Sequence, residues 1–589
     1  MNLITLLKQT TSASLDSLYQ VKIQPEQVLV NATKPEFEGD YTIVLFAFVK
    51  QLGKNPEVVG NELGNAMQKA IPTIITEFNI VKGFLNFTIS NDYWFEFIKN
   101  LSPNELMPAV EHKRKIMVEY SSPNTNKPLH LGHLRNNFLG WSIAEILKLQ
   151  GHEVVKTCIV NDRGIHICKS MIAWQLFANG ATPSSTNKKG DHFVGDYYVK
   201  YNDAYKAEVA GLVSGGMTQE LAEKEASIFK AAQEMLLKWE QGDAATLDLW
   251  KKMNAWVYEG FEVTYKKIGS DFFKTYYESN TYLLGKELVE EGLVKKVFYQ
   301  KEDSSVWIDL TADGLDEKIV RRKDGTSVYM TQDIGLAQLK QKEFNTDASI
   351  YVVGDEQNYH FKVLKLICQK LQQPAADGIY HLSYGMVELP NGKMKSREGT
   401  VVDADDLVDE MIAISKLKTE SLGKVADFTQ AQLTELYNTI GLGALKFFLL
   451  RVDPKKKMIF NPEESIDFHG FTGPFIQYTH ARIKSILRKT GTNVSLKANE
   501  LLPLEKQLAI ELSTFPAVVN EAAENLDPSK IAIYAFNLAK LFNTFYAELS
   551  IANAESETKK QLRIQLGILT AATLQKSMSV LGIAVPEQM

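Results

Sequence analysis

The stretch 116–160 constrains the fold of this 589-residue chain more than any other. An apolar run at 116–118 predicts a buried strand, and a loop rich in Ser, Pro and Asn follows it. From about Gly132, apolar residues recur at helical spacing until Gly151, a residue type common at helix C-termini. The apolar run at 154–160 predicts a second buried strand. A strand, loop, helix and strand in this order predict the start of a parallel α/β sheet.

Two histidines, His130 and His133, lie where the predicted loop becomes the helix. Backbone N–H groups at a helix start attract phosphate, and imidazoles placed there can donate hydrogen bonds to phosphate oxygens during displacement at phosphorus. Gly132 between them leaves room for a flat ring, such as a purine, to lie on the backbone. Two polar loop residues without a function are the alternative, and for H-x-G-H alone that alternative is at least as good.

The residues around this pair resemble a known signature. The string HLGH at 130–133 is similar to the HIGH motif of class I aminoacyl-tRNA synthetases. The longer string SSPNTNKPLHLGHLRNN resembles the form of that motif in arginyl-tRNA synthetases. Far downstream, KMKSR at 393–397 resembles the KMSKS phosphate loop of the same class. Two phosphate motifs in this order are far more specific than either alone, and the resemblance extends over nearly the whole chain.

The composition is typical of a soluble globular protein, with 45% hydrophobic and 23% charged residues. Lys8 interrupts the only candidate for a signal-peptide core, and the apolar run at 43–49 is too short to span a bilayer. We therefore expect a cytoplasmic protein without membrane contact. The three cysteines form no C-x-x-C pair, so we expect neither disulfides nor a structural zinc site. The net charge of −6 neither supports nor excludes an RNA partner.

The expected fold class is a multidomain α/β protein built on a Rossmann-like, parallel-sheet catalytic domain. Mixed helix and strand signals over 1–110 predict an α+β domain, which resembles the additional tRNA-binding domain of arginyl-tRNA synthetases. Residues 111–405 are the predicted catalytic domain, with a helical insertion at about 181–295. Residues 406–465 are a predicted helical linker that contacts the tRNA stem. Residues 466–589 are a predicted all-α anticodon-binding bundle.

A short segment before Ala337 carries the residues expected to select the substrate. Ser327 to Met330 is predicted as a short strand, and Thr331 as the cap of the helix that follows. Tyr329 and Asp333 are four residues apart, so both can face one pocket. On the residues alone, an alternative for Asp333 is favoured, namely a first-turn carboxylate that complements the helix dipole.

The resemblance implies that the pocket binds arginine. A guanidinium is planar, permanently charged and carries five donors, so a selective pocket needs carboxylates and a hydrogen-bonding aromatic side chain. A lysine substrate would leave buried acceptors unpaired there. By resemblance, the residues that hold the guanidinium are Glu119, Tyr329 and Asp333. Those that hold the α-amino and carboxylate groups are Asn124 and Gln357.

The resemblance also implies a two-step reaction. The arginine carboxylate attacks the α-phosphorus of ATP, which gives arginyl-adenylate and pyrophosphate, and a terminal adenosine hydroxyl of tRNA(Arg) then takes the arginyl group. Mg²⁺ accompanies ATP, tRNA binding is expected to be needed before activation, and the enzyme is expected to act as a monomer. The residues implied to bind ATP are His130, Gly132, His133, Lys393 and Met394.

One position departs from the family pattern. KMSKS has its second lysine at the fourth position, where this chain has Ser396. Departing pyrophosphate develops negative charge, so a nearby cation should stabilise the transition state. Lys395, one residue earlier, and Lys127, three residues before His130, are the two candidates. Arginyl enzymes with a degenerate KMSKS loop commonly carry a lysine just before HIGH, which favours Lys127; a solvated loop cation is the alternative for that residue.

Three other functions remain as alternatives at this point. A class I synthetase for glutamate, glutamine or cysteine would share the phosphate motifs, although the SSPN…HLGH string and Asp333 argue against it. A paralogue that binds tRNA without catalysis would be expected to have damaged motifs. A nucleotidyltransferase for a small metabolite would leave most of the 589 residues without a function.

Overall fold

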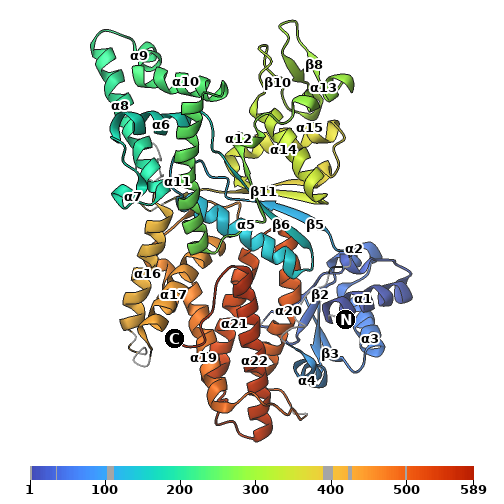
Figure 1. Cartoon of the computed structure of the whole chain (residues 1–589). Helices are drawn as coiled ribbons and strands as arrows, with labels where there is room; N and C mark the ends of the chain where they lie inside the picture. The colour runs from blue at the N-terminus through green and yellow to red at the C-terminus, as the bar shows by residue number, and fades with distance from the viewer. Residues whose placement is uncertain are drawn as a thin grey trace. The chain divides into compact units, whose positions relative to one another are not determined.

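The computed structural model describes residues 3–34, 36–102, 110, 112–388, 390, 402–421, 423, 428–497 and 500–589 (Figure 1). The chain forms two compact units. The first, which we call the N-terminal unit, combines Met1–Leu106 with Arg482–Pro516 and Asn537–Leu574. The second, the catalytic unit, combines Met107–Ala481 with Ala517–Phe536 and Gln575–Met589. The domain boundaries read from the sequence stay a prediction.

The N-terminal unit contains an antiparallel sheet in the order β1-β2-β4-β3. One ion pair joins this sheet region to a helical segment of the same unit, and two more join α20 (Pro503–Asn525) to α22 (Glu557–Val580). The Lys506 ammonium lies 2.7 Å from the Asp40 carboxylate, and the fully buried Glu505 pairs with Arg563 and Lys559. The elements at its N-terminal end are β1 (Val30–Ala32), β2 (Tyr41–Val44), β3 (Ile75–Val81), β4 (Phe84–Ile89), α1 (Leu3–Tyr19), α2 (Phe46–Leu52), α3 (Pro56–Ala70) and α4 (Asn91–Asn100).

A five-stranded parallel sheet in the order β12-β11-β5-β6-β7 lies at the centre of the catalytic unit. Its middle strand is apolar and buried, since Met117 and Val118 have no exposed surface. The parallel sheet predicted from the sequence is thus confirmed. The bounds are β5 (Lys115–Glu119), β6 (Glu153–Val160), β7 (Lys274–Tyr277), β11 (Ala348–Gly354) and β12 (Ile379–Tyr384), with helices α5 (Leu131–Leu149), α6 (Ile165–Phe177), α14 (Tyr329–Phe344) and α15 (Asn358–Lys370) between them.

Helix α5 connects β5 to β6, as the sequence predicted. It is buried along most of its length and ends just before Gly151, whose φ of 97° is a left-handed conformation that glycine adopts without strain. Arg135 in its second turn is only 1% exposed, and its guanidinium donates to the carbonyls of Pro454 and Lys456 at 3.1 and 2.8 Å. Burial lowers the pKa of Arg135 to about 10. These bonds tie α5 to a loop over 300 residues away in sequence.

Helices separate β6 from β7, in the region where the sequence predicted a helical insertion. Helices α8 and α11 lie side by side within it (Figure 1). The sequence analysis missed β7, which lies inside the range 181–295, because its residues KTYY form no apolar run. The insertion helices are α7 (Pro183–Thr186), α8 (Gly190–Ser214), α9 (Gln219–Glu225), α10 (Ser227–Glu240) and α11 (Ala244–Ile268).

A small antiparallel sheet, β10-β9-β8, lies between β7 and α14 in sequence. Thr331 does not cap α14, and no strand forms at 327–330: the helix begins at Tyr329, and the Thr331 hydroxyl donates to the carbonyl of Val320. That part of the sequence prediction was wrong, because the Thr331 hydroxyl bonds a strand distant in sequence instead of the local backbone. The elements here are α12 (Glu278–Thr281), α13 (Lys286–Val294), β8 (Tyr299–Gln300), β9 (Val306–Ile308) and β10 (Lys318–Arg321).

The C-terminal part of the chain is almost entirely helical, as predicted. Helices α19 to α22 each contribute residues to both compact units. A two-stranded parallel pairing, β13 with β14, joins residues before and after α16 and α17. The bounds are β13 (Val387–Glu388), α16 (Ala404–Ser421), α17 (Gln430–Leu450), β14 (Met458–Ile459), α18 (Pro462–Ser465), α19 (Gly473–Thr490), α20 (Pro503–Asn525), α21 (Ser529–Glu548) and α22 (Glu557–Val580).

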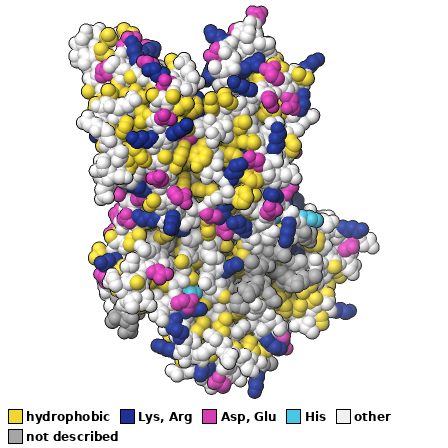
Figure 2. Space-filling view, in the orientation of Figure 1, with side chains coloured by type: hydrophobic (Ala, Val, Ile, Leu, Met, Phe, Trp, Pro, Cys, Tyr) yellow, Lys and Arg dark blue, Asp and Glu magenta, His cyan; other side chains and the backbone are white. Residues whose placement is uncertain are grey.

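Lys, Arg, Asp and Glu side chains are interspersed over the face seen in Figure 2, and hydrophobic side chains gather near the middle of its upper half. This mixture agrees with a net charge as small as −6 for 589 residues. Of the helices in the described residues, none combines the length and apolar character that a membrane span requires.

The close approach of α5 to the end of β5 generates a stability prediction. A Cβ on Gly140 would lie 2.4 Å from the Cβ of Tyr120, which is fully buried. We expect Gly140→Ala to destabilise the protein by about 1–3 kcal/mol through overpacking. Gly211→Ala in α8 is the matched control, because no atom lies within 4 Å of its added Cβ; it should stabilise slightly. Thermal unfolding measures both, and a Gly140→Ala midpoint at or above wild type would contradict the packing argument.

Candidate active site

The site lies where the strand order of the central sheet reverses. Strand β5 pairs with β6 on one side and with β11 on the other. In an open parallel sheet, a crevice forms outside the carboxyl ends of two such strands, and ligands bind there. The loop after β5 leads to His130 and α5, and the segment after β11 begins at Asp355. A parallel bridge between Asn124 and Asn161 continues the pairing of β5 and β6 into this crevice.

The two histidines form a reciprocal cap at the start of α5. Nδ1 of His130 accepts a hydrogen bond from the N–H of Gly132 at 3.1 Å. Nδ1 of His133 accepts from the N–H of His130 at 3.2 Å. The rings are tilted by 46° with centroids 3.9 Å apart. The cap therefore satisfies two N–H groups that a helix start leaves unpaired.

Both imidazoles are held neutral. Burial lowers the pKa of His130 to about 3, with a smaller effect from the Lys127 cation. The pKa of His133 is held well below its usual value by burial, and also by His130 and Lys127. Because each Nδ1 accepts from the backbone, the single ring proton lies on Nε2. Each ring thus keeps one N–H that can donate to a phosphate oxygen at neutral pH.

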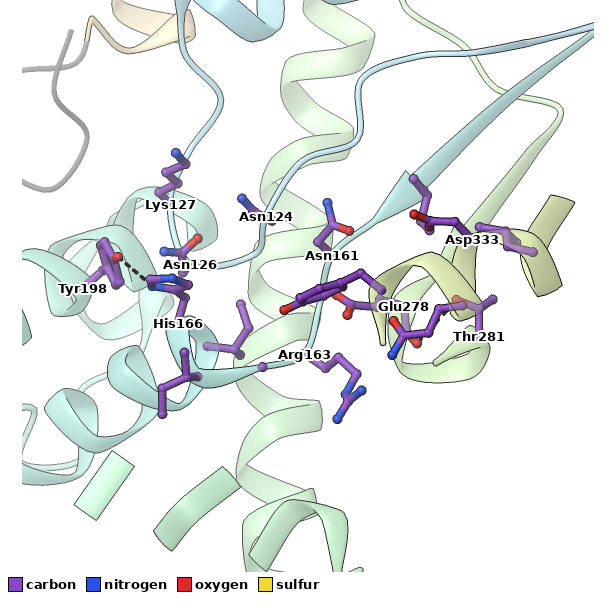
Figure 3. A pocket seen from close by; sticks show the side chains of 17 residues that line it. Asn124, Asn126, Lys127, Asn161, Arg163, His166, Tyr198, Glu278, Thr281 and Asp333 are labelled. Atoms are coloured by element: carbon purple, nitrogen blue, oxygen red, sulfur yellow. Dashed lines mark hydrogen bonds between the residues drawn. The ribbon is translucent and has the colours of Figure 1, made fainter. Parts of the chain in front are cut away.

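A cavity of about 430 Å³ opens at the carboxyl ends of β5 and β6 (Figure 3). This volume is in the range of sites for small ligands. Lys127, Asn126, His166 and Tyr198 lie at one end in Figure 3, whereas Asp333, Thr281 and Glu278 lie at the other. The lining residues used below come from four elements or loops: Asn124, Asn126 and Lys127; Asn161 and Arg163; Glu278; and Tyr329 and Asp333.

Tyr329 and Asp333 lie one turn apart at the start of α14, and both line the cavity. The Asp333 carboxylate is 2.6 Å from Nε2 of His360 in α15, which fixes its orientation. The Tyr329 side chain is 72% exposed at the mouth of the cavity. The structure therefore brings these two predicted residues together with Asn124 and Lys127 in one cavity.

Glu119 and Gln357 are not among the described residues that line this cavity. Glu119 ends β5 and is buried, where its carboxylate pairs with the ammonium of Lys340 and accepts from the Thr157 hydroxyl at 3.2 Å. Gln357 ends a short 3₁₀ turn directly after β11. Lys393, Met394 and Lys395 lie outside the described residues.

Sequence reasoning missed Glu278, which lines the cavity from the start of α12. Burial raises the pKa of its carboxyl to about 7, and the Arg163 cation opposes that rise. Arg163 is itself held between the rings of Trp239 and Tyr282. The available signal was weak, because Glu278 follows β7, the strand that the sequence analysis also missed.

Asn126 is a second residue that the sequence analysis did not select. It lines the cavity and is 4% exposed, and its buried Oδ1 has no hydrogen-bond partner among the described residues. A buried acceptor without a partner is unusual in a folded protein. A donor on a ligand, such as an ammonium or guanidinium N–H, would satisfy it.

Comparison with known proteins agrees with this geometry. Residues 98–461 match the family model described as tRNA synthetases class I (R), catalytic domain. Residues 3–89 match the arginyl tRNA synthetase N terminal domain, and residues 476–589 match the DALR anticodon binding domain. The fold and the histidine pair thus define the class of this protein, which is a class I aminoacyl-tRNA synthetase.

Full-length relatives narrow this class. The arginine–tRNA ligase of Flavobacterium psychrophilum is 50% identical and that of Bacteroides thetaiotaomicron 51%, with 100% and 98% of both chains covered, respectively. The solved arginyl-tRNA synthetase of Thermus thermophilus shares the fold, with a TM-score of 0.81, 24% identity and 100% of both chains covered. The chain belongs to the arginyl-tRNA synthetase family.

The raised pKa of Glu278 generates a pH prediction. A carboxyl with a pKa of about 7 gains its negative charge as pH rises through neutrality, and a cationic substrate binds the charged form better. We expect kcat/KM for arginine to rise over about pH 6–8 in the wild type and to be lower and flatter in Glu278→Gln. Arginine-dependent pyrophosphate exchange measures it, with kcat/KM for ATP at saturating arginine as the control. An unchanged rise in Glu278→Gln would assign the titration to another group.

Proposed function

We propose that this chain activates L-arginine with ATP and transfers the arginyl group to tRNA(Arg) for protein synthesis. The observation that carries the proposal is that two features lie at the same edge of the central sheet. A cavity with carboxylates at one end opens at the same sheet edge as two neutral histidines at a helix start. The first suits a cationic amino acid, and the second suits ATP phosphates.

We propose that Asp333 and Tyr329 bind the guanidinium, as the family resemblance implies, and that Glu278 adds a second carboxylate to the cationic substrate. Asn124 and the unpartnered Oδ1 of Asn126 lie toward the Lys127 end, where the α-amino group of the substrate would lie (Figure 3). Gln357, at the carboxyl end of β11, would help to hold the same end of the substrate.

In the activation step, the arginine carboxylate attacks the α-phosphorus of ATP, and the bond to pyrophosphate breaks. The Nε2–H groups of His130 and His133 would donate to phosphate oxygens as their charge grows. Gly132 between them leaves the helix start open to the adenosine moiety, and Lys393 and Met394 complete the proposed ATP site. No side chain has to form a covalent intermediate.

Mg²⁺ would enter with ATP. The described residues contain one group of three side chains whose ligand atoms are close enough for a metal ion, Asp191, His192 and Asp405. The Lys189 ammonium already lies 3.0 Å from the Asp191 carboxylate and 2.6 Å from that of Asp405, so this group does not fit a divalent cation. We therefore propose that the phosphates of ATP hold the ion, which would neutralise charge on the leaving pyrophosphate.

For tRNA binding, we propose that each domain has the role expected from the sequence. The N-terminal domain 1–110 contacts the tRNA, residues 406–465 contact its stem, and the helices in 466–589 read the anticodon. Helix α19 turns its His480 inward, where Nδ1 lies 3.0 Å from the carbonyl of Pro586, so only the outer face of that helix is open to RNA. We further propose a monomer that acts in the cytoplasm, a compartment that suits its three buried, free cysteines.

Pyrophosphate exchange tests the function directly. The protein is incubated with ATP and labelled pyrophosphate and with each amino acid in turn, in the presence and absence of total tRNA. Exchange that depends on arginine and on tRNA supports the proposal. Exchange with another amino acid, or none with any, would reject it. Attachment of labelled arginine to tRNA tests the second step.

Asp333 generates a substrate-selective prediction. Replacing its carboxylate with an amide leaves a bound guanidinium without one partner of a desolvated pair. We expect Asp333→Asn to lower kcat/KM for arginine by about a hundredfold or more, with KM for ATP nearly unchanged. Asp324→Asn, in an exposed turn, is the control. Near-normal arginine kinetics in Asp333→Asn would remove this residue from the site.

The two candidate lysines generate another prediction. Lys127 lines the cavity and influences both histidines, which places its charge near the proposed phosphate site. We expect Lys127→Ala to lower kcat for activation more than Lys395→Ala does, while both variants fold and bind tRNA. Rapid-quench measurement of adenylate formation compares them. The opposite order would assign the missing KMSKS charge to Lys395.

A further inference from the structure

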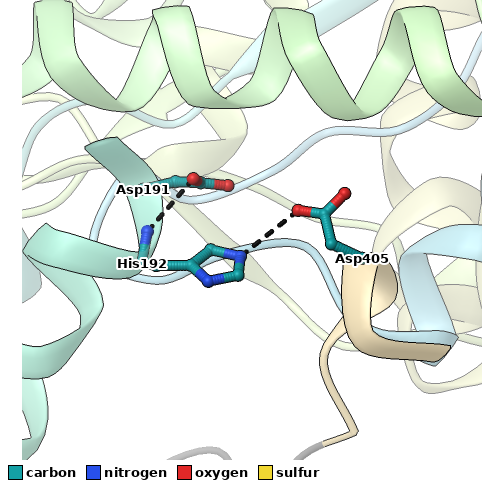
Figure 4. Close-up of side chains that lie close together, drawn as sticks. All are labelled: Asp191, His192 and Asp405. Carbon is teal, nitrogen blue, oxygen red and sulfur yellow. Dashed lines mark hydrogen bonds and ion pairs between the residues drawn. The ribbon is translucent and has the colours of Figure 1, made fainter. Parts of the chain in front are cut away.

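A polar junction connects the helical insertion to the residues that precede α16. Nε2 of His192, in the first turn of α8, lies 3.2 Å from the carboxylate of Asp405 (Figure 4). The same nitrogen lies 3.2 Å from the carboxylate of Asp403. The side chain of Asp403 also accepts hydrogen bonds from the N–H groups of Asp405 and Asp406 at 2.8 and 3.2 Å, so it caps α16. One imidazole thus hydrogen-bonds the Asp405 carboxylate and lies within ion-pair distance of the Asp403 carboxylate at the start of that helix.

The junction is charged and partly enclosed. Three carboxylates meet there, and Asp191 has no exposed surface. The Lys189 ammonium bridges Asp191 and Asp405 and lies 2.5 Å from the Thr264 hydroxyl of α11. One lysine balances one of the three negative charges. A protonated His192 balances a second, so its proton is an integral part of the junction.

On its other side, the segment 402–405 is hydrogen-bonded to the backbone around His130, where α5 begins. The N–H of Leu131 donates to the carbonyl of Val402 at 3.2 Å, and the N–H of Ala404 donates to the carbonyl of Leu129 at 3.0 Å. These two bonds form an antiparallel bridge between His130 and Asp403. A displacement of Asp403 would therefore move the backbone of His130, whose ring faces the proposed phosphate site.

We propose that His192 is a positioning residue for the activation step: by bonding Asp403 and Asp405 it holds the 402–405 segment, and through the backbone bridge it sets the position of His130. His192 does not touch substrate. Its effect should fall on kcat rather than on KM for arginine, because a small misplacement of a transition-state donor slows the reaction without weakening binding of the distant amino acid. The inference rests on the function proposed above.

The charge on His192 makes the junction pH-dependent. The hydrogen bond to Asp405 raises the pKa of His192, burial opposes the rise, and Asp403 and Asp191 add to it. A group with a raised pKa is charged below that value and neutral above it. The junction is therefore complete at low pH and weakens as pH rises through the raised pKa. The charged and titratable groups that face it are Lys189 and Asp191 at the start of α8, Asp196 of the same helix, Lys267 of α11, Asp403 and Asp405 at α16, and His130 and Lys127 of the loop after β5.

The test uses the full-length enzyme with tRNA(Arg), at saturating ATP and a range of arginine concentrations that gives both kcat and KM, over about pH 6–9. Two variants separate charge from shape. His192→Gln can donate one hydrogen bond but carries no charge, and His192→Arg carries a permanent charge with several donors. His469→Gln, at an exposed position in the same unit, is the control. Thermal unfolding and tRNA binding show that each variant is folded.

We expect kcat of the wild type to fall as pH rises above the pKa of His192. At the acidic end of the range, kcat of His192→Gln should be about tenfold lower than that of the wild type, with KM for arginine unchanged. Its kcat should not fall as pH rises. His192→Arg should recover most of the activity and should also lack the fall. A wild-type pH profile in His192→Gln, or a change confined to KM, would overturn the proposal. The wild type shows in the same assay whether the protein activates arginine. A failure of the proposed function can therefore be distinguished from a failure of the His192 proposal.

Discussion

The site depends on one constraint of sheet topology, the reversal of strand order at β5. Crossovers in parallel sheets are right-handed, so the connections from β5 to β6 and from β7 onward to β11 leave the sheet on opposite faces. The carboxyl ends of β5 and β11 are therefore not covered by one shared connection. The loops that end there carry Asn124, His130 and Gln357. Residues scattered over more than 200 positions meet because all follow strands of one sheet at the same edge.

The electrostatics at this edge of the sheet distinguish two kinds of hydrogen-bond donor, neutral imidazoles and lysine cations. Burial and the capping bonds hold His130 and His133 neutral, so in the proposed mechanism these side chains would stabilise phosphate as dipoles and would not compete with a lysine for protons. The Lys127 cation contributes to the low pKa values of both histidines, because a nearby positive charge disfavours protonation of an imidazole. A net positive charge for departing pyrophosphate then has to come from lysines or from Mg²⁺. This division explains why the loss of one KMSKS lysine in this chain requires compensation.

Local patterns predicted the elements that carry strong local signals. The apolar runs of β5 and β6 and the glycine after α5 marked those elements to within a residue or two. The i, i+4 spacing placed Tyr329 and Asp333 on one face, although the start of their helix was misjudged. In contrast, β7 is short and half polar, and its register is determined by pairing with β6. Glu278 follows β7, so no local feature of the sequence could select it.

The position of Glu119 shows why a motif can identify a residue without giving its state. The sequence places it correctly at the end of β5, but only the fold brings the Lys340 ammonium against it. Both side chains are buried, at 7% and 2% exposure, so neither charge can be left unpaired without a large penalty. A guanidinium that approached Glu119 would meet a second cation there. Binding to Asp333 and Glu278, which face the cavity, avoids that repulsion. In the proposed site, Glu119 would contact the guanidinium only by sharing its carboxylate with Lys340. Its buried pair with Lys340 otherwise fixes β5 against α14 beneath the proposed arginine site.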